Sequence, residues 1–134
     1  MVTDLLGPSL GDLLTFCGGR FSLKTSLMIF YQVLERVEFM HDKHFIHRDI
    51  KPQNIMMGLG DASNIVHMID FGLTRLVIDP KTGKHIPFII GKNLVGTCRY
   101  VSLNSHLGHE VSRRDDLITI GYMMINLLTG SLPW

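Results

Sequence analysis

The sequence predicts an α+β fold that is mainly helical, and three patterns support this. Apolar residues recur at three- and four-residue spacing over residues 23–44, which is typical of a long amphipathic helix. A second helical run covers residues 117–128. Between them, apolar runs at 55–57 and 64–69 flank a glycine-containing turn, which predicts a hairpin. A chain of 134 residues with 46% hydrophobic content fits one folded domain.

Composition and charge disfavour several classes of protein. The net charge is +1, so no overall field attracts nucleic acid or an anionic membrane, and no apolar run has the length of a membrane span. We therefore expect neither nucleic acid nor a membrane as a partner. Cys17 and Cys98 are far apart and fit no metal-ligand spacing. This favours a reducing intracellular compartment, cytoplasmic or nuclear.

The chain opens with a short apolar run over residues 1–6, for which an edge strand is the simplest interpretation. Ser9 and Asp12 then stand at the cap and third positions of a capping box, which predicts a short helix. Gly18-Gly19 should end this helix because glycine adopts positive φ without steric cost. The residues expected on its buried side are Leu10, Leu13 and Leu14.

The long helix should begin after Ser22, with one apolar face in the core. The residues expected on this face are Leu27, Phe30, Tyr31, Leu34, Val37, Met40 and His41. His41, His44 and His47 fall three residues apart, a spacing that could suggest a metal site. No cysteine or convergent carboxylate completes a ligand set, so we expect no metal at these histidines.

The segment His47-Arg48-Asp49-Ile50-Lys51-Pro52-Gln53-Asn54 places a carboxylate, an ammonium and an amide in one short loop. Phosphoryl transfer to a hydroxyl needs a carboxylate near the attacking oxygen, cations on the phosphate, and ligands for those cations. Asp49 suits the first role, Lys51 the second, and Asn54 the third as a Mg²⁺ ligand. The alternative interpretation is a polar turn rich in Asp, Pro and Asn.

Asp70-Phe71-Gly72 follows sixteen residues after Asn54, directly behind an apolar run. The carboxylate of Asp70 suits a Mg²⁺ ligand because hard divalent cations prefer oxygen. Together, the two motifs resemble the catalytic loop and metal-binding turn of eukaryotic protein kinases. Lys51, in the order D-x-K-P-x-N, resembles serine/threonine kinases rather than tyrosine kinases.

Other segments narrow the resemblance to the casein kinase 1 family. Where that family replaces A-P-E with S-I-N, this chain has Ser102-Leu103-Asn104. The remaining matching segments lie at residues 5–10, 84–88, 92–100, 102–108, 112–117 and 130–134. The resemblance implies transfer of the ATP γ-phosphate to Ser/Thr hydroxyls of protein substrates that are acidic or already phosphorylated, with ATP and Mg²⁺ as cofactors.

The resemblance also implies a partial kinase fold over residues 1–134, namely the large-lobe half without the small lobe. Its parts would be the hinge, catalytic loop, D-F-G turn, an irregular activation segment at about 73–96, and a central helix. The sequence contains no G-x-G-x-x-G loop. The alternative function is therefore a truncated, non-catalytic kinase fragment or pseudokinase that acts only by binding protein.

For the nucleotide, the resemblance assigns the backbone of Asp4 to Leu6 to the adenine edge. Met56 and Ile69 would form the apolar floor beneath the adenine. Lys51 would point its charge toward the γ-phosphate.

For the substrate, the resemblance implies that Thr97 bridges Asp49 and Lys51. Arg99 would bind an anionic group on the substrate. Asp116 would hold the backbone of the H-R-D segment in place. Arg113 and Arg114 could add positive potential nearby, or could simply begin a solvated helix.

Overall fold

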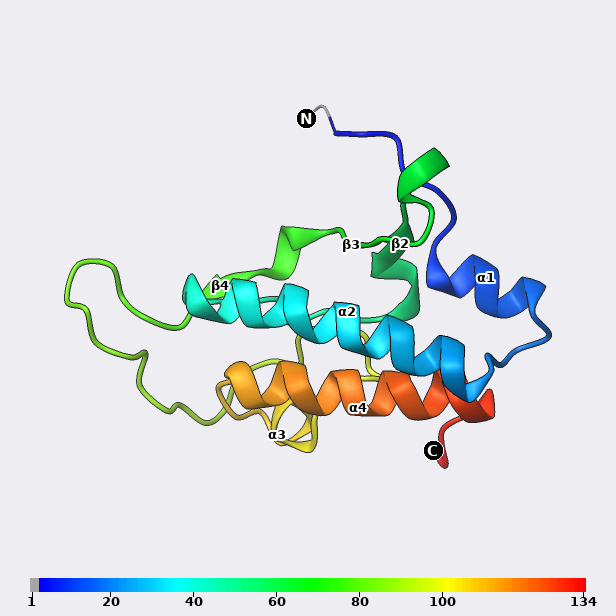
Figure 1. The fold of residues 1–134 in the computed structure, drawn as a ribbon. Coiled ribbons are helices and arrows are strands. Elements are labelled where there is room, and N and C mark those ends of the chain that lie inside the picture. The colour runs from blue at the N-terminus through cyan, green and yellow to red at the C-terminus, as the bar shows by residue number, and fades with distance from the viewer. Residues whose placement is uncertain (1–2) are drawn as a thin grey trace.

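Two long helices, α2 (Leu23–Asp42) and α4 (Arg113–Thr129), form the framework of the molecule. The computed structural model describes residues 3–134, and in it these helices lie side by side and antiparallel (Figure 1). Val33 and Val37 of α2 share one buried core with Ile120 and Met123 of α4. The predicted α+β, mainly helical fold is confirmed.

The polar loops are carried by short strands beside α2. β2 (Ile55–Met57) pairs antiparallel with β3 (Val66–Met68), which confirms the predicted hairpin. β1 (Phe45–Ile46) pairs with β4 (Arg75–Leu76), a contact that the sequence did not predict. Two-residue strands show no periodicity, so only the tertiary structure reveals them.

The first helix, α1 (Leu10–Phe16), begins at the predicted capping box. Ser9 Oγ accepts from the Asp12 N–H, and an Asp12 carboxylate oxygen accepts from the Ser9 N–H at 3.0 Å. Of the described residues before it, 3–8 form no regular strand, so the edge-strand interpretation is wrong there; residues 1–2 lie outside the described part. Gly7 donates instead to the Met57 carbonyl, which holds this segment against β2.

The buried face of α2 differs from the predicted one. Leu27 and Tyr31 are 50% and 64% exposed, although both were expected in the core. The fully buried positions of the helix are Ser26, Ile29, Val33 and Val37. Phe30 and Leu34 do pack against the core, at its margin. The buried face of the helix is thus set by its neighbours α4, β1 and β3, which the sequence pattern alone did not define.

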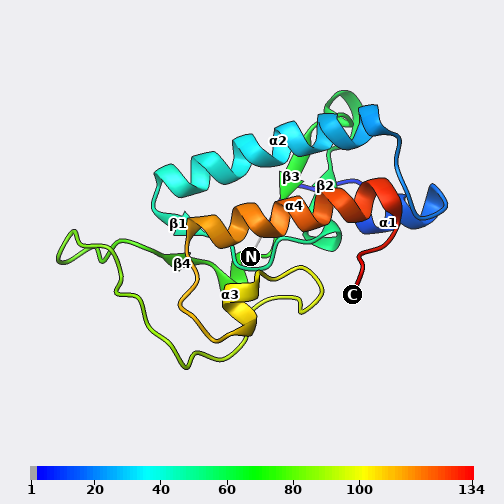
Figure 2. The same cartoon turned by 90° about the horizontal axis from the view of Figure 1, so that it is seen from below.

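Residues 73–96 are largely irregular, as predicted, and their outer part extends beyond the helices in both views (Figure 2). A short helix, α3 (Leu103–His106), follows them. Ser102 and Asn104, from the segment that resembles S-I-N, both donate to Asp115 Oδ1 at 2.6 and 2.9 Å. These bonds tie α3 to the start of α4. Over residues 3–134, no helix has the length and apolarity needed to cross a bilayer.

Candidate active site

The catalytic loop joins β1 to β2 and packs its polar groups against one another. Asp49 and Asn54 are 7% and 6% exposed. The Asn54 amide nitrogen donates to the Asp49 carbonyl oxygen at 2.9 Å and to Asp49 Oδ2 at 3.2 Å. Lys51 Nζ donates to the same Oδ2 at 2.8 Å. The short helix Pro52–Asn54 bends the chain so that the carboxylate, ammonium and amide converge.

Thr97 completes this group from 48 residues away in the sequence. Its Oγ1 donates to Asp49 Oδ1 at 2.7 Å and accepts from Lys51 Nζ at 3.1 Å. The structure therefore brings together the three residues expected to be catalytic. Asp49 Oδ1 receives one side-chain hydrogen bond, which leaves acceptor capacity for a substrate hydroxyl.

The environment of Asp49 favours its ionised form. Burial acts to raise the pKa of this carboxyl, but hydrogen bonds from Lys51 and Thr97, together with the lysine charge, outweigh burial and lower it. Asp49 is therefore a carboxylate at neutral pH, as a proton acceptor must be.

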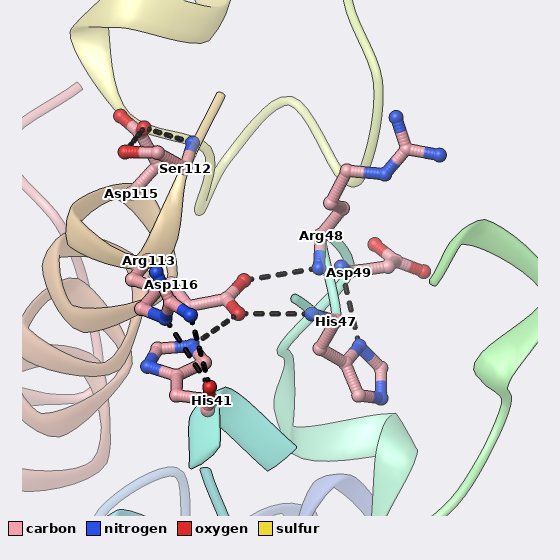
Figure 3. A network of polar contacts seen from close by, with 8 residues as sticks. All are labelled: His41, His47, Arg48, Asp49, Ser112, Arg113, Asp115 and Asp116. Atoms are coloured by element: carbon pink, nitrogen blue, oxygen red, sulfur yellow. Dashed lines mark hydrogen bonds and ion pairs between the residues drawn. The ribbon is translucent and has the colours of Figure 1, made fainter. Parts of the chain in front are cut away.

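Asp116, near the start of α4, holds the backbone of the loop from the side on which that helix lies (Figure 3). Its Oδ2 accepts from the His47 N–H at 2.9 Å, and its Oδ1 accepts from the Arg48 N–H at 3.0 Å. Arg48 has a φ of 71°, a left-handed conformation that a non-glycine residue adopts at a cost. The two hydrogen bonds stabilise that conformation. The role expected for Asp116 is confirmed.

Two side chains that support this anchor were not identified from the sequence. His41 Nε2 lies 2.9 Å from Asp116 Oδ2, so the histidine weighed as a metal ligand instead orients the carboxylate. Arg113 donates to the His41 carbonyl oxygen at 3.2 Å and lies 3.1 Å from His44 Nδ1. It thereby satisfies a backbone acceptor in the C-terminal turn of α2.

Asp70, the first residue of the D-F-G turn, has a left-handed backbone conformation with φ 62°. Its Oδ1 accepts from the Gly72 N–H at 3.3 Å, and its side chain is exposed. Phe71 packs against the His47 ring, with 5.5 Å between centroids. This contact couples the D-F-G turn to the catalytic loop.

The two residues expected to hold Mg²⁺ present oxygen ligands. The amide nitrogen of Asn54 donates to Asp49, so its side-chain oxygen remains as the atom that could coordinate a metal ion. The Asp70 carboxylate is accessible. One carboxylate and one amide oxygen, with phosphate oxygens and water, suit this ion, so the residues present fit it. Among residues 3–134, no group of three or more His, Cys, Asp or Glu could hold a metal by itself.

The residues expected around the adenine lie near one another. Ile69 donates to the Asn54 carbonyl oxygen at 3.0 Å, and Met56 pairs with His67 across the hairpin. Leu6 is half-buried and precedes Gly7, whose N–H donates to the Met57 carbonyl oxygen of β2. Asp4 is exposed. Two cavities of about 600 and 540 Å³ lie elsewhere, beside Phe71 and beside α1. None of the residues expected around the adenine lines either of these cavities.

Arg99 is exposed and follows Thr97 by two residues in the sequence. Its carbonyl oxygen accepts from Trp134 Nε1 at 3.0 Å. It lines a cavity of about 450 Å³ with Cys98 and Leu103. The Arg99 side chain is therefore accessible to solvent.

A second polar cluster was missed by sequence reasoning. Glu110 is 6% exposed and pairs with Arg75 at 2.6 Å and with Lys92 at 3.3 Å. Arg48 lies nearby, and burial together with the charge of Arg75 lowers its pKa. Glu110 falls outside every predicted element, so no pattern marked it. Glu110 thus ties both ends of the irregular segment, at Arg75 and Lys92, to the stretch that precedes α4.

A family model of the protein kinase domain matches residues 1–134. Because the match covers the whole chain, the chain belongs to the protein kinase domain family. The fold is accordingly that of a partial protein kinase, built around the catalytic loop and the D-F-G turn. Protein kinases in general act on protein substrates and use ATP with Mg²⁺.

Proposed function

We propose that this chain is a serine/threonine protein kinase of the casein kinase 1 type. It would transfer the γ-phosphate of ATP to Ser/Thr hydroxyls in acidic or previously phosphorylated protein substrates. The observation that carries the proposal is the triangle of Asp49, Lys51 and Thr97, with both Asp49 oxygens held by hydrogen bonds. Two free, exposed cysteines accord with the intracellular location that we also propose.

In this proposal each residue of the triangle has one task. Asp49 orients the acceptor hydroxyl and takes its proton, because its lowered pKa keeps it ionised. Lys51 places positive charge beside the transferring group, where negative charge develops. Thr97 fixes the positions of the Asp49 and Lys51 side chains relative to each other, because its hydroxyl bonds to both.

The nucleotide would lie along the wall formed by Asp4 to Leu6, Met56 and Ile69. Asn54 and Asp70 would hold Mg²⁺, since each presents a side-chain oxygen there. When bound, Mg-ATP supplies the phosphoryl group and the cation that neutralises its charge.

Substrate preference rests on two features. Lys51 and Thr97 border Asp49 in the manner that resembles serine/threonine kinases. Arg99 is exposed and suits bidentate contact with a phosphate or carboxylate on the substrate. A peptide with a phosphoserine near its acceptor should therefore be a better substrate than its unphosphorylated form, and Arg99→Ala should remove that advantage.

Phosphate transfer from radiolabelled ATP to such a peptide tests the chemistry. Asp49→Asn should lower the rate by about 10²–10⁴-fold, the usual contribution of a positioned base. Asp61→Asn is the matched control, since Asp61 is exposed and lies in the turn of the β2–β3 hairpin. Transfer that survives in Asp49→Asn would refute the role of Asp49.

Thermal unfolding with and without Mg-ATP tests nucleotide binding separately. A ligand at a hundred times its dissociation constant stabilises the folded state by about 2.7 kcal/mol. We expect a Mg-dependent rise in melting temperature for the parent chain and none for Asp70→Ala. The absence of any shift in the parent would contradict ATP binding.

A second candidate is a kinase-like domain that acts only by binding protein. It is favoured by the apolar cavity of about 600 Å³ that opens beside Phe71, a residue that is 54% exposed. Under this alternative Mg-ATP would leave the melting temperature unchanged and no variant at Asp49 would alter phosphorylation. The two measurements above distinguish the candidates.

A further inference from the structure

Charge is unevenly distributed along the chain. Residues 80–109 contain Lys81, Lys84, Lys92 and Arg99 but no Asp or Glu. The rest of the chain holds the other nine Lys/Arg and all 12 acidic residues, so its net charge is −3. The net charge of +1 for the whole chain therefore conceals a basic segment, although Asp79 and Glu110 stand at its two ends and Glu110 pairs with Lys92.

The same segment exposes large apolar side chains. Phe88 and Ile90 are 64% and 69% exposed, and Ile89 and Leu94 are 38% and 43% exposed. They are close together in the sequence, in an outer loop that we define as residues 79–94. Contiguous exposed apolar side chains on a folded domain commonly mark an interaction surface.

The backbone gives the outer loop a defined shape. Asp79 donates to the Lys84 carbonyl oxygen at 2.9 Å, which places Lys81 and Lys84 at the tip of a turn. Phe88 packs against His109, with 5.3 Å between ring centroids. The loop extends away from α2 and α4 in both views, so it can approach a flat surface without obstruction (Figures 1 and 2).

We propose that the outer loop is a peripheral contact for an anionic lipid surface. Lys81 and Lys84 would lie among acidic headgroups, while Phe88 and Ile90 would enter the boundary between headgroups and acyl chains. Asp79 keeps its negative charge and opposes this contact in part; its carboxylate accepts from the Lys81 N–H at 2.8 Å, and Lys81 and Lys84 outnumber it in the turn.

Other occupants fit the surface less well. A second copy of the chain would bring the lysines of two outer loops into repulsive proximity. An acidic protein segment would pair with Lys81 and Lys84 but would need its own apolar side chains to cover Phe88 and Ile90. A bilayer with anionic lipid supplies both kinds of contact, and a few lysines with a small apolar group suffice for reversible binding.

Sedimentation of the whole chain with vesicles tests the proposal. We expect binding to vesicles that mix phosphatidylcholine with phosphatidylserine, weaker binding at high salt, and little binding to phosphatidylcholine alone. Lys81→Ser with Lys84→Ser should weaken binding about thirtyfold, since each lysine near an anionic surface contributes about fivefold. Phe88→Ser with Ile90→Ser should weaken it at least as much.

Matched controls change equally exposed residues elsewhere. Arg20→Ser with Lys24→Ser and Phe16→Ser with Tyr31→Ser remove the same kinds of group from α1, α2 and their connection, and should leave binding unchanged. The Phe88→Trp variant should shift its fluorescence to shorter wavelength when vesicles are added, which reports insertion directly.

Several results would overturn the proposal. These are no binding to anionic vesicles, equal binding to neutral vesicles, equal losses in the control variants, and no fluorescence shift. Two further results would assign the surface to a protein partner. One is binding of the outer loop to an acidic peptide without any binding to vesicles, and the other is self-association that Phe88→Ser abolishes. None of these readouts depends on phosphate transfer, so the lipid proposal and the proposed function can fail separately.

Discussion

The catalytic loop, residues 47–54, and the outer loop, residues 79–94, are both largely irregular and both carry charge, but they are held differently. In the catalytic loop Asp49 and Asn54 are buried, and their partners include Thr97 from a distant part of the chain. In the outer loop the turn bonds of Asp79 to Lys84 and of Gly83 to Asp79 are local, and two longer-range backbone bonds, from the Lys92 N–H to the Gly108 carbonyl and from the Glu110 N–H to the Ile89 carbonyl, hold its second half while most of its side chains stay exposed.

This difference has a physical cause. A buried polar group must find a partner inside the protein, because an unpaired one costs about 1–3 kcal/mol. The catalytic loop therefore requires Asp116 and Thr97 in fixed positions, while most side chains of the outer loop are exposed and need no partner inside the protein. We expect substitutions to be costly in the first region and mild in the second.

The largest effect should come from Asp116→Ala. The change leaves the N–H groups of His47 and Arg48 without their acceptor, and at about 1–3 kcal/mol for each we expect the free energy of unfolding to fall by about 4 kcal/mol. Urea denaturation followed by circular dichroism measures the change. Asp116→Asn keeps one acceptor oxygen and should cost less; an equal cost would show that charge, not hydrogen bonding, provides the anchor.

Gly96→Ala should have the next largest effect. Gly96 has a φ of 95°, and a Cβ there would collide with the Arg48 carbonyl oxygen and lie 2.9 Å from Val101 Cγ1. Strain and overlap together should cost about 3 kcal/mol. Gly83→Ala is the matched control, because its φ is 66° but its surroundings are open; it should cost about 1 kcal/mol. Similar melting temperatures for the two variants would contradict the close contact of Gly96 with Arg48 and Val101.

A smaller effect should appear on acidification. The carboxyls of Asp49 and Asp115 have pKa values below the ordinary 3.8, because hydrogen bonds outweigh burial in both. A lowered folded-state pKa stabilises the protein above the ordinary value and loses that contribution as pH falls below it. The free energy of unfolding should therefore fall as pH drops through about 4 and below, as urea titrations at several pH values would measure.

The control for the pH experiment is a pair of variants. Asp115→Asn should reduce the dependence on pH, because it removes a carboxyl bonded to Ser102 and Asn104. Asp61→Asn, at an exposed turn, should leave the dependence unchanged. A slope that Asp115→Asn does not alter would contradict this assignment.

The smallest effect should come from the outer loop. Lys84→Ser and Phe88→Ser each change an exposed side chain, so we expect the free energy of unfolding to stay within about 0.5 kcal/mol of the parent. Lys92→Ser should cost more, since it removes a partner of the buried Glu110. A large loss for Lys84→Ser would show that the outer loop is held as firmly as the catalytic loop.

Local signals in the sequence predicted much of the architecture. The capping box of Ser9 and Asp12, the start of α2 after Ser22, and the hairpin of β2 and β3 were all correct. Each depends on residues within a few positions of one another, where side-chain chemistry dictates backbone conformation directly.

Features that depend on distant contacts were predicted less well. The buried face of α2 was misplaced at Leu27 and Tyr31, and the pairing of β1 with β4 was missed. The cluster around Glu110 and the bond between His41 and Asp116 were missed as well. In each case the partner lies on another element, and packing decides which surfaces meet.

The sequence by itself determined the chemical groups of the candidate site, since Asp49, Lys51 and Asn54 lie within six residues and Asp70 follows in a second recognisable motif. Family resemblance, rather than any residue pattern, pointed to Thr97. Only the tertiary structure decided that Thr97 Oγ1 lies 2.7 Å from Asp49 and that Asp116 is held by His41. Ile50 and Tyr100, close in sequence to Asp49 and Thr97, lie in the core that α2 and α4 share, and burying such apolar side chains brings remote polar groups close enough to bond to one another.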